Sequence, residues 1–565
     1  MTIRSFLEDA VKCSPQLPAQ RFFQGNQWVS RSYASLKERV VRASVVLRHL
    51  NLQPGRQNVA LMMENCPEWQ EIYLALAGSG LAVVPLDPKL RANEVQHILQ
   101  NSEAVAIFAG TRLKDVISQA VANLPDLKSC VWVGEGSTMV GAVKDRVCYA
   151  YEAITNCASS AYESAREWFE KHTPSEGTIA SIVYTSGTTG KPKGAVLTHG
   201  NFTSNVQSTV ERIKFCPNEN FLNVLPLFHS FSFTGNFMIP LRLKACCSFV
   251  RSMKTITDDM KVLKPTIILA VPLMAEKLYS RITEKLNKNA LARLLSRIGL
   301  HAIIHKMVKA KFGGKLRLLG IGGAPTDVAT LKGFQSVGIP VFEGYGLTEC
   351  SPGVAYPSLD DFVPGTVGTV IPGMEYKLVD VDETGAGELC VKGPNVMLGY
   401  YKNEEATAEI IDADGFLHTG DLVRFDTNGH IRICGRRKAL IVNREGKNIY
   451  PEEIEQIIER CPLVQDVIVL GYHGAGETSE RVGAILVPNV EVLEQKRTEL
   501  GWTTDEQAGD YLLHEVHAVC HKHLADYKIP RKIIVRKTAL ERTSTLKVRR
   551  ATYAGTLDES FRDIG

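Results

Sequence analysis

The sequence predicts an α/β fold built from two domains of unequal size, and three features of the chain predict it. Helical and strand-like runs alternate from residue 1 to about 175 and again from Lys261 to Val341. Strands that alternate with helices form parallel sheets, so we expect a large N-terminal domain, residues 1–436, of parallel-type α/β subdomains. Strand-like runs broken by Asp and Gly between Val367 and Val391 predict a small β-barrel-like subdomain within it. Short strands mixed with helices predict a small, mobile α+β C-terminal domain, residues 437–565.

The expected elements follow from the spacing of apolar residues. In the first part of the chain they are a helix over Ser35–Leu50, a buried strand over Asn58–Met63, a helix over Glu68–Gly80, and strands over Leu81–Leu86 and Val105–Ala109. In the C-terminal domain they are strands over Gln465–Leu470, Val482–Val487 and Lys532–Arg536, and helices over Pro451–Cys461 and Ala508–Ala525.

The composition is that of a folded protein with nearly balanced charge. Lys and Arg number 65, Asp and Glu number 61, and the net charge is +4. This balance argues against nucleic acid as a partner and against an acidic disordered chain. One segment, His521 to Arg550, is rich in Lys and Arg. It is either a solvated basic surface or a lobe that handles anions, and composition alone favours the solvated surface.

Cysteine usage and apolar runs bear on location. The 13 cysteines form no CxxC pair, so we expect reduced thiols in a cytoplasmic protein. The first residues are too acidic for a signal peptide. The longest stretch without charged residues, Asn220–Leu241, contains too many polar residues for a membrane span and is expected to form buried core or a pocket wall. Peripheral contact with a membrane is left open.

The most informative stretch begins with an expected buried strand, Ile179–Tyr184. The strand runs into a loop rich in glycine, hydroxyl and lysine residues. Glycine lets the backbone approach an anion, hydroxyl groups donate to phosphate oxygens, and lysine neutralises their charge. The Walker A pattern does not fit, because Thr185 stands where that pattern needs a glycine and Pro192 follows Lys191. The residues expected to contact phosphates are Thr185, Ser186, Gly187, Thr188, Thr189, Gly190, Lys191 and Lys193.

This loop resembles the phosphate loop of the adenylate-forming superfamily, which includes acyl-CoA synthetases, adenylation domains of peptide synthetases and luciferases. Further motifs resemble the same superfamily in its order along nearly the whole chain. They are Leu225-Pro-Leu-Phe-His-Ser230, Gly320-Ile-Gly-Gly-Ala-Pro325, Gly344-Tyr-Gly-Leu-Thr-Glu349, Gly387-Glu-Leu, Gly399-Tyr, Thr419-Gly-Asp421, Gly435-Arg-Arg-Lys438, Gly446-Lys-Asn-Ile-Tyr-Pro-Glu-Glu-Ile-Glu455 and Arg542-Thr-Ser-Thr-Leu-Lys547.

The resemblance implies an ATP site and a magnesium ion. Glu349 would hold Mg²⁺, with Thr185 as a second ligand and Thr348 on a phosphate, because a hard cation prefers oxygen ligands. Tyr345 would stack on adenine. Gly323, Ala324 and Gly346 would line the nucleotide and acyl pocket with little side-chain bulk. The ribose would be bound by Asp421 and Arg436.

Three further residues acquire roles from the resemblance. Lys547 would reach the substrate carboxylate and the α-phosphate during adenylation. Two neighbours depart from the superfamily pattern there, since Glu541 replaces a proline and Leu546 replaces a glycine. Lys438 would be the hinge about which the C-terminal domain alternates between two poses. His229 would gate the acyl pocket, although a histidine among phenylalanines is otherwise most often a buried core residue.

The substrate is expected to be a medium- or long-chain fatty acid, with CoA as the acceptor. Acetyl-specific members carry a tryptophan where this chain has Gly346, and Gly446-Lys-Asn-Ile-Tyr-Pro with the preceding Arg444-Glu445 resembles fatty-acyl-CoA synthetases. No segment of carrier-domain length follows Arg550, which favours free CoA. An aryl-acid or branched-acid CoA ligase, or a ligase that loads an acyl carrier protein, stays open. A non-catalytic scaffold is disfavoured, because Lys193, Glu349, Asp421 and Lys547 are all present.

Overall fold

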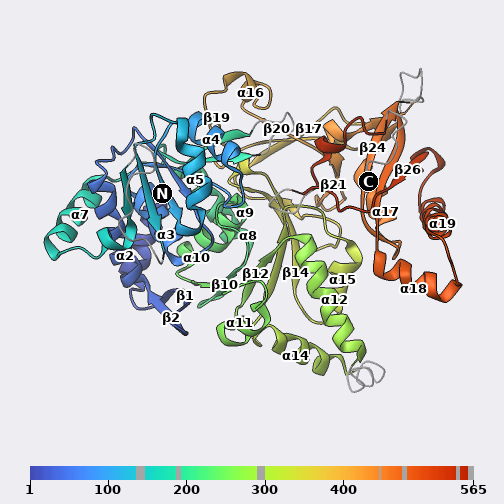
Figure 1. The fold of residues 1–565 in the computed structure, drawn as a ribbon, viewed down its shortest axis with the longest axis horizontal. Helices are drawn as coiled ribbons and strands as arrows, with labels where there is room; N and C mark the ends of the chain where they lie inside the picture. The colour runs from blue at the N-terminus through green and yellow to red at the C-terminus, as the bar shows by residue number, and fades with distance from the viewer. Residues whose placement is uncertain are drawn as a thin grey trace. The chain divides into compact units, whose positions relative to one another are not determined.

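The computed structural model describes residues 1–134, 147–185, 192–288, 300–443, 447–473, 480–542 and 548–557. Two compact units make up the chain (Figure 1). The first contains Met1–Tyr376 and Val391–Leu417, and the second contains Lys377–Cys390 and the chain from His418 onward. The predicted boundary at residue 436 falls inside the second unit and remains a proposal about where the chain hinges.

The first unit contains an eight-stranded sheet of mostly parallel strands among the described residues. Its order is β19 (Gly399–Tyr400), β9 (Lys193–Thr198), β8 (Ile179–Thr185), β4 (Ala82–Pro85), β3 (Asn58–Met62), β5 (Ala104–Gly110), β6 (Ser129–Val133) and β7 (Val147–Ala150). From β8 to β7 the neighbouring strands run parallel, and β9 turns back antiparallel along β8. Helices α4 (Ala92–Asn101) and α5 (Lys114–Ala120) pack on one face of this sheet (Figure 1).

The second sheet of the same unit has nine strands. Its order is β16 (Thr369–Val370), β15 (Gly353–Tyr356), β14 (Val341–Gly346), β13 (Leu318–Gly322), β12 (Ile267–Ala270), β10 (Asn220–Asn223), β11 (Cys246–Phe249), β1 (Pro18–Gln24) and β2 (Gln27–Ser32). The central pairs are parallel. Four helices cover one face through a shared apolar core: α11 (Ile256–Leu263), α12 (Pro272–Lys288), α14 (His301–Lys311) and α15 (Val328–Ser336).

The predicted helices and strands of the N-terminal part are confirmed within a few residues. The helix expected from Ser35 is α2 (Tyr33–His49), which begins earlier because the Ser32 side chain accepts a hydrogen bond from the Ser35 amide. The helix expected from Glu68 is α3 (Pro67–Gly78), which starts at a proline suited to the first turn. Other helices of this unit are α1 (Ile3–Cys13), α6 (Tyr151–Thr155), α7 (Ser159–Lys171), α8 (His199–Arg212) and α16 (Glu404–Ala408).

The uncharged stretch 220–241 is buried, as expected. After β10 it forms α9 (Ser230–Phe233), a π-helical turn (Thr234–Met238) and the start of α10 (Ile239–Leu243). Phe233 and Phe237 pack edge-on against each other and against Trp69 of α3. Among the residues described, no helix is long and apolar enough to cross a lipid bilayer.

The second unit is a mixture of sheets and helices, as the sequence predicts. Its strands are β17 (Glu375–Val379), β18 (Gly387–Lys392), β20 (Leu417–Phe425) and β21 (Ile431–Arg436) in one sheet, β22 (Ile441–Val442) with β23 (Asn448–Ile449), and β24 (Val464–His473), β25 (Glu480–Pro488) and β26 (Lys532–Val535). Helices α17 (Pro451–Ile458), α18 (Val490–Leu500) and α19 (Asp505–His523) accompany them, and α17 and α19 pack on the three-stranded sheet.

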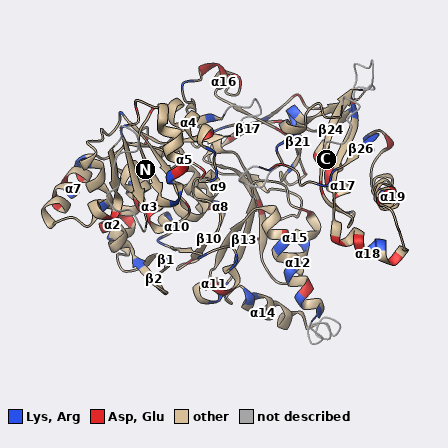
Figure 2. Ribbon diagram, viewed as in Figure 1, with Lys and Arg blue, Asp and Glu red and all other residues tan. Residues whose placement is uncertain are grey.

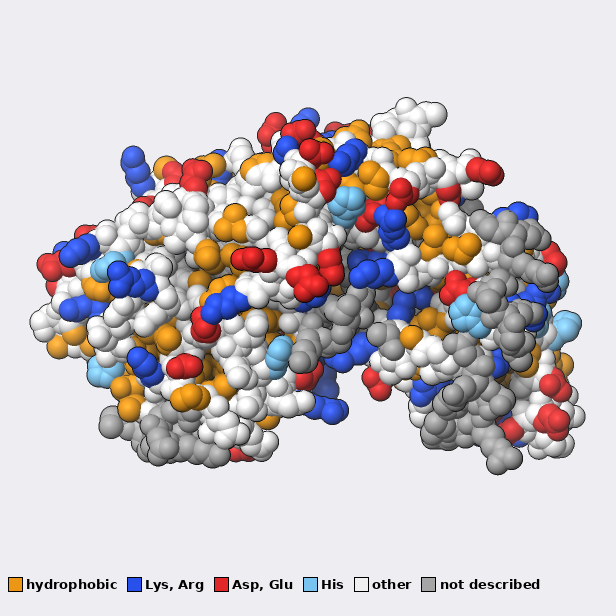
Figure 3. All heavy atoms as spheres, turned by 90° about the horizontal axis from the view of Figure 1, so that it is seen from above, with side chains coloured by type: hydrophobic (Ala, Val, Ile, Leu, Met, Phe, Trp, Pro, Cys, Tyr) orange, Lys and Arg blue, Asp and Glu red, His pale blue; other side chains and the backbone are white. Residues whose placement is uncertain are grey.

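The basic segment 521–550 forms several ion pairs within its own unit. Lys528 pairs with Glu453, Arg542 with Asp466, and Arg550 with Glu455. Acidic and basic residues alternate along the described ribbon in Figure 2, and their side chains are interspersed on the face that Figure 3 displays. These three pairs neutralise part of the positive charge of the segment.

Candidate active site

The roots of the phosphate-like loop lie side by side at the end of a β-hairpin. Strands β8 and β9 pair antiparallel, and their last partners are Thr185 and Lys193. The Thr185 hydroxyl lies 3.5 Å from the Lys193 carbonyl oxygen. Residues Ser186, Gly187, Thr188, Thr189, Gly190 and Lys191 lie outside the described part of the chain. The pairing therefore fixes the two ends of the loop and leaves the hydroxyl of Thr185 and the ammonium of Lys193 at its base.

Glu349 and Thr348 sit on a single 3₁₀ turn, Thr348–Cys350, that follows β14. The Glu349 carboxylate accepts a hydrogen bond of 2.8 Å from the Tyr400 hydroxyl. The Thr348 hydroxyl lies 3.1 Å from the hydroxyl of Ser230. Among the described residues, no Lys or Arg forms an ion pair with Glu349, so its charge is not neutralised there. An unneutralised carboxylate beside hydroxyl groups is a donor set that suits a hard divalent cation.

The motif that contains His229 is held in place by a distant asparagine. The Asn65 amide donates to the Leu225 carbonyl at 2.7 Å, and its oxygen accepts from the Leu227 amide at 2.8 Å. His229 then begins α9 as its N-cap, and its Nδ1 lies 3.4 Å from the Phe231 amide. The imidazole thus serves a local capping role in this structure. Sequence reasoning missed Asn65, because no nearby motif marks it.

The glycine-rich turn after β13 is braced by a buried glutamate that the sequence analysis did not single out. Glu343 in β14 accepts a hydrogen bond of 2.6 Å from the Thr326 amide. Burial raises the pKa of Glu343 to about 7. Gly323 has φ = +93°, a backbone conformation that favours glycine. A side chain at Gly322 would lie 3.1 Å from the Phe231 ring. The turn that carries Gly323 and Ala324 is therefore tied to β14, directly ahead of Tyr345.

Tyr345 and Gly346 end β14. Tyr345 pairs with Ala355 of β15, and Gly346 pairs with Gly353. A Cβ at Gly346 would lie 2.1 Å from the Pro352 carbonyl oxygen, so glycine is required there by backbone packing. The absence of bulk at Gly346 was expected to open the acyl pocket. In the structure it serves the β14–β15 contact, and the glycines that line the apolar cavity are Gly235 and Gly344.

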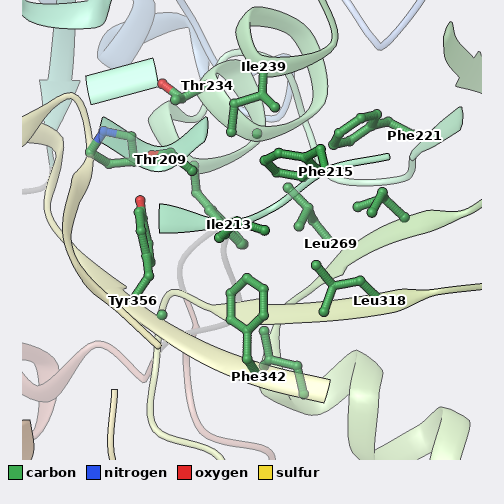
Figure 4. A pocket seen from close by; sticks show the side chains of 16 residues that line it. Thr209, Ile213, Phe215, Phe221, Thr234, Ile239, Leu269, Leu318, Phe342 and Tyr356 are labelled. Carbon is green, nitrogen blue, oxygen red and sulfur yellow. The ribbon is translucent and has the colours of Figure 1, made fainter. Parts of the chain in front are cut away.

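An apolar cavity of about 40 Å³ lies beside this turn, on the face of the nine-stranded sheet that α11 and α14 do not cover (Figure 4). Two of its lining residues, Phe231 and Gly344, also face Gly322, so one end of the cavity adjoins the glycine-rich turn. Its lining consists of Thr209, Ile213, Phe215, Phe221, Phe231, Thr234, Gly235, Ile239, Ile267, Leu269, Leu318, Ile321, Phe342, Gly344, Pro352 and Tyr356. Such a lining suits an apolar chain.

In the second unit, Asp421 and Arg436 face each other across the β20–β21 pair. The Arg436 Nε lies 2.8 Å from the Asp421 Oδ1, and Asp421 is buried whereas Arg436 is half exposed. The turn before Asp421 is shaped by the Gly387-Glu-Leu motif. The Gly420 amide donates to the Glu388 carboxylate at 3.0 Å, and the Thr419 hydroxyl donates to the Leu389 carbonyl at 2.7 Å.

Arg437, next to the predicted hinge residue Lys438, contacts the same Glu388 carboxylate. It forms ion pairs with Glu388 at 2.5 Å and with Asp380 at 2.7 Å. Ligand atoms of Glu388, Cys390 and His418 lie within 4.8 Å of one another, as in a metal site. Because the Arg437 guanidinium already neutralises Glu388, we interpret the cluster as an ion-pair network around the Thr419-Gly-Asp421 turn. Lys438 lies on the 3₁₀ turn Arg437–Ala439.

Lys547 and Gly446 lie outside the described residues. The flanks of the lysine segment are described, since Arg542 and Val548 form an antiparallel bridge. The first unit thus brings together Thr185, Lys193, Thr348, Glu349, His229 and the glycine-rich turn through connected elements. The second unit holds Asp421, Arg436 and Lys438.

Comparisons with known proteins agree with the superfamily motifs. The family model for AMP-binding enzymes matches residues 7–401, and the model for the C-terminal domain of AMP-binding enzymes matches residues 453–547. Long-chain-fatty-acid–CoA ligase 1 of Homo sapiens is 30% identical over 512 residues, which cover 85% of this chain and 72% of that protein. Long-chain-fatty-acid–CoA ligase FadD15 of Mycobacterium bovis is 28% identical over 95% of this chain and 92% of its own. The structure of ATP-bound MatB from Rhodopseudomonas palustris matches with a TM-score of 0.76 at 26% identity, covering 98% of this chain and 99% of that one.

Proposed function

Because the chain belongs to the AMP-binding enzyme family of adenylate-forming enzymes, we propose that it activates a medium- or long-chain fatty acid. The carboxylate attacks the α-phosphate of ATP, which gives an acyl-adenylate and releases pyrophosphate. The thiol of CoA then attacks the acyl carbonyl, which gives acyl-CoA and releases AMP. Relatives named long-chain-fatty-acid–CoA ligases support the class of acid and the acceptor.

The observation that carries the proposal is the apolar cavity beside the glycine-rich turn. The turn is expected to face the acyl-adenylate, and Phe231 and Gly344 connect it to the cavity. A carboxylate at the turn would therefore leave its alkyl chain in an apolar enclosure. Burial of alkyl chain contributes about 0.8 kcal/mol per methylene, so this enclosure favours longer acids over acetate.

The polar residues divide the remaining tasks. Thr185 and Lys193 would bind the β- and γ-phosphates at the end of the β8–β9 hairpin. Glu349, with Thr185, would hold Mg²⁺, which when bound neutralises the charge of the phosphates. Thr348 would donate its hydroxyl to a phosphate oxygen, and Tyr345 would stack on adenine.

The second unit would bind the ribose through Asp421 and Arg436 and supply Lys547 to the reacting carboxylate. A lysine on a separate unit can be delivered for adenylation and withdrawn for thioester formation, and Lys438 is the hinge that we propose for this motion. The proposed domains are residues 1–436 and 437–565.

The test is pyrophosphate release on a series of acids, measured with and without CoA. Turnover that rises with chain length and requires CoA for repeated cycles supports the proposal. Turnover on aryl acids alone would replace the fatty acid with an aromatic one. A single burst that only an acyl carrier protein relieves would replace CoA as the acceptor.

A further inference from the structure

A short segment after the second sheet, residues 397–401, links the proposed metal ligand to the strand that carries Lys193. The Met397 amide donates to the Glu349 carbonyl oxygen at 2.8 Å. The next residues pair with β9, since the Leu398 amide donates to Val196 and the Tyr401 amide donates to Gly194. The segment is thus fixed at one end to the Glu349 turn and at the other to the root of the phosphate-like loop.

Tyr400 lies in the middle of this segment and touches both functional side chains. Its hydroxyl donates to Glu349 Oε1 at 2.8 Å, and its ring centroid lies 5.3 Å from the Lys193 ammonium. Its own backbone amide is fixed by the Thr407 hydroxyl at 2.9 Å. One aromatic residue therefore contacts the carboxylate through its edge and the cation through its face.

The chemistry of this hydrogen bond preserves the charge of Glu349. An ionised carboxylate can only accept a hydrogen bond, so the Tyr400 hydroxyl is the donor in this contact. A neutral donor fixes the orientation of a carboxylate without neutralising it, whereas a Lys or Arg partner would compete with a cation. The second oxygen of Glu349 keeps its full capacity to bind a metal ion.

We propose that Tyr400 is a positioning residue that aims Glu349 at the metal ion and holds Lys193 beside the phosphates. The inference rests on the proposed function, in which Glu349 is a ligand of Mg²⁺ and Lys193 contacts the nucleotide. Residues that orient a metal ligand through a hydrogen bond typically affect metal affinity about 10- to 100-fold. Tyr400 acts through Glu349 and Lys193 and need not touch the substrate.

Two substitutions separate the two contacts. Tyr400→Phe removes the hydroxyl and keeps the ring, so we expect metal affinity to fall about tenfold and metal-free nucleotide affinity to stay unchanged. Tyr400→Leu also removes the ring face, so we expect nucleotide affinity to fall as well. The measurement is Mn²⁺ binding by electron paramagnetic resonance with a non-hydrolysable ATP analogue, together with binding of the same analogue without metal.

The chain offers a matched control in the next residue. The Tyr401 hydroxyl donates to a different carboxylate, Glu103, at 3.2 Å. Tyr401→Phe makes the same chemical change at the adjacent residue and should leave Mn²⁺ affinity within twofold of the wild type. Excess Mg²⁺ should restore pyrophosphate release by Tyr400→Phe, because the substitution lowers the affinity for the metal ion.

The outcomes distinguish this inference from the proposed function. Wild-type Mn²⁺ affinity in Tyr400→Phe, or an equal loss in Tyr401→Phe, would overturn the role of Tyr400 and leave the ligase proposal intact. Failure of the wild-type protein to bind the Mn²⁺–nucleotide complex would overturn both.

Discussion

A substitution in the wall of the apolar cavity should reduce the length of the acids that the protein accepts. Leu269 fills the space beside two glycines: a Cβ at Gly235 would lie 2.2 Å from its Cδ1, and one at Gly320 would lie 2.8 Å from its Cδ2. Carbon atoms in contact are about 3.5–4.0 Å apart, so Gly235→Ala requires the Leu269 methyl to retreat by roughly 1.5 Å. Because the other methyl already lies against Gly320, the open direction is the cavity.

The expected size of the effect follows from the volume lost. The new methyl group and the Leu269 methyl that it displaces each take up about the space of one methylene. Gly235→Ala should therefore remove room for one or two methylenes. At about 0.8 kcal/mol per methylene, this corresponds to a loss of roughly 4- to 16-fold in kcat/KM for acids that fill the cavity. Acids too short to reach Leu269 should be unaffected.

The assay is pyrophosphate release with acids of increasing length, for Gly235→Ala and two companion variants. In Gly177→Ala the new methyl meets open space, so this control should leave the whole profile unchanged. The double variant Gly235→Ala with Leu269→Ala should recover the longer acids. A uniform loss at every chain length, or no loss at any, would refute the assignment of this cavity to the acyl chain.

Three further variants test other parts of the site. Glu343→Gln should weaken the pH dependence of stability. Burial raises the pKa of Glu343 to about 7, so the stabilisation from its protonated carboxyl group is complete below about pH 4.5 and is lost as the pH rises from there through 7. The loss of about 3 kcal/mol should be seen as a falling urea midpoint. An unchanged pH profile in the variant would contradict this. Asp421→Asn should raise the KM for ATP roughly tenfold with a smaller effect on kcat, since a charged hydrogen bond contributes about 1.5–3 kcal/mol, and an unchanged KM would remove the ribose assignment. Lys547→Ala should slow pyrophosphate release by about 100-fold or more while thioester formation from supplied acyl-adenylate continues, and wild-type pyrophosphate release would exclude the lysine from adenylation.

Most helices and strands of the fold could be predicted from local sequence patterns. The helices α2 and α3 and the strands β3, β4 and β5 could be predicted because each is a distinct apolar run, at helical spacing in the helices and nearly continuous in the strands. The same holds for α19, which begins at a capping box on Thr504. The order of strands within each sheet could not be predicted, because it depends on pairings between segments far apart in the chain.

The sequence motifs of the candidate site could be predicted, but the contacts between them could not. Glu349, Asp421 and Lys193 each stand in a recognisable stretch. The residues that hold them do not, because their partners are distant in sequence: Tyr400 is 51 residues from Glu349, and Asn65 is 160 residues from Leu225. Gly399-Tyr was recognised as a motif, but only the structure gives its tyrosine a partner. The requirement for glycine at position 346 could be recognised only in the structure, because the Pro352 carbonyl oxygen occupies the space that a Cβ would need.

The central claim is that the chain joins a fatty acid to CoA through an adenylate. The most direct test is pyrophosphate release with ATP and Mg²⁺ on acids from C2 to C18, with benzoate and coumarate, each with and without CoA. The account predicts release that grows with alkyl length and cycles only when CoA is present. No release on any acid, or release confined to the aromatic acids, would contradict it.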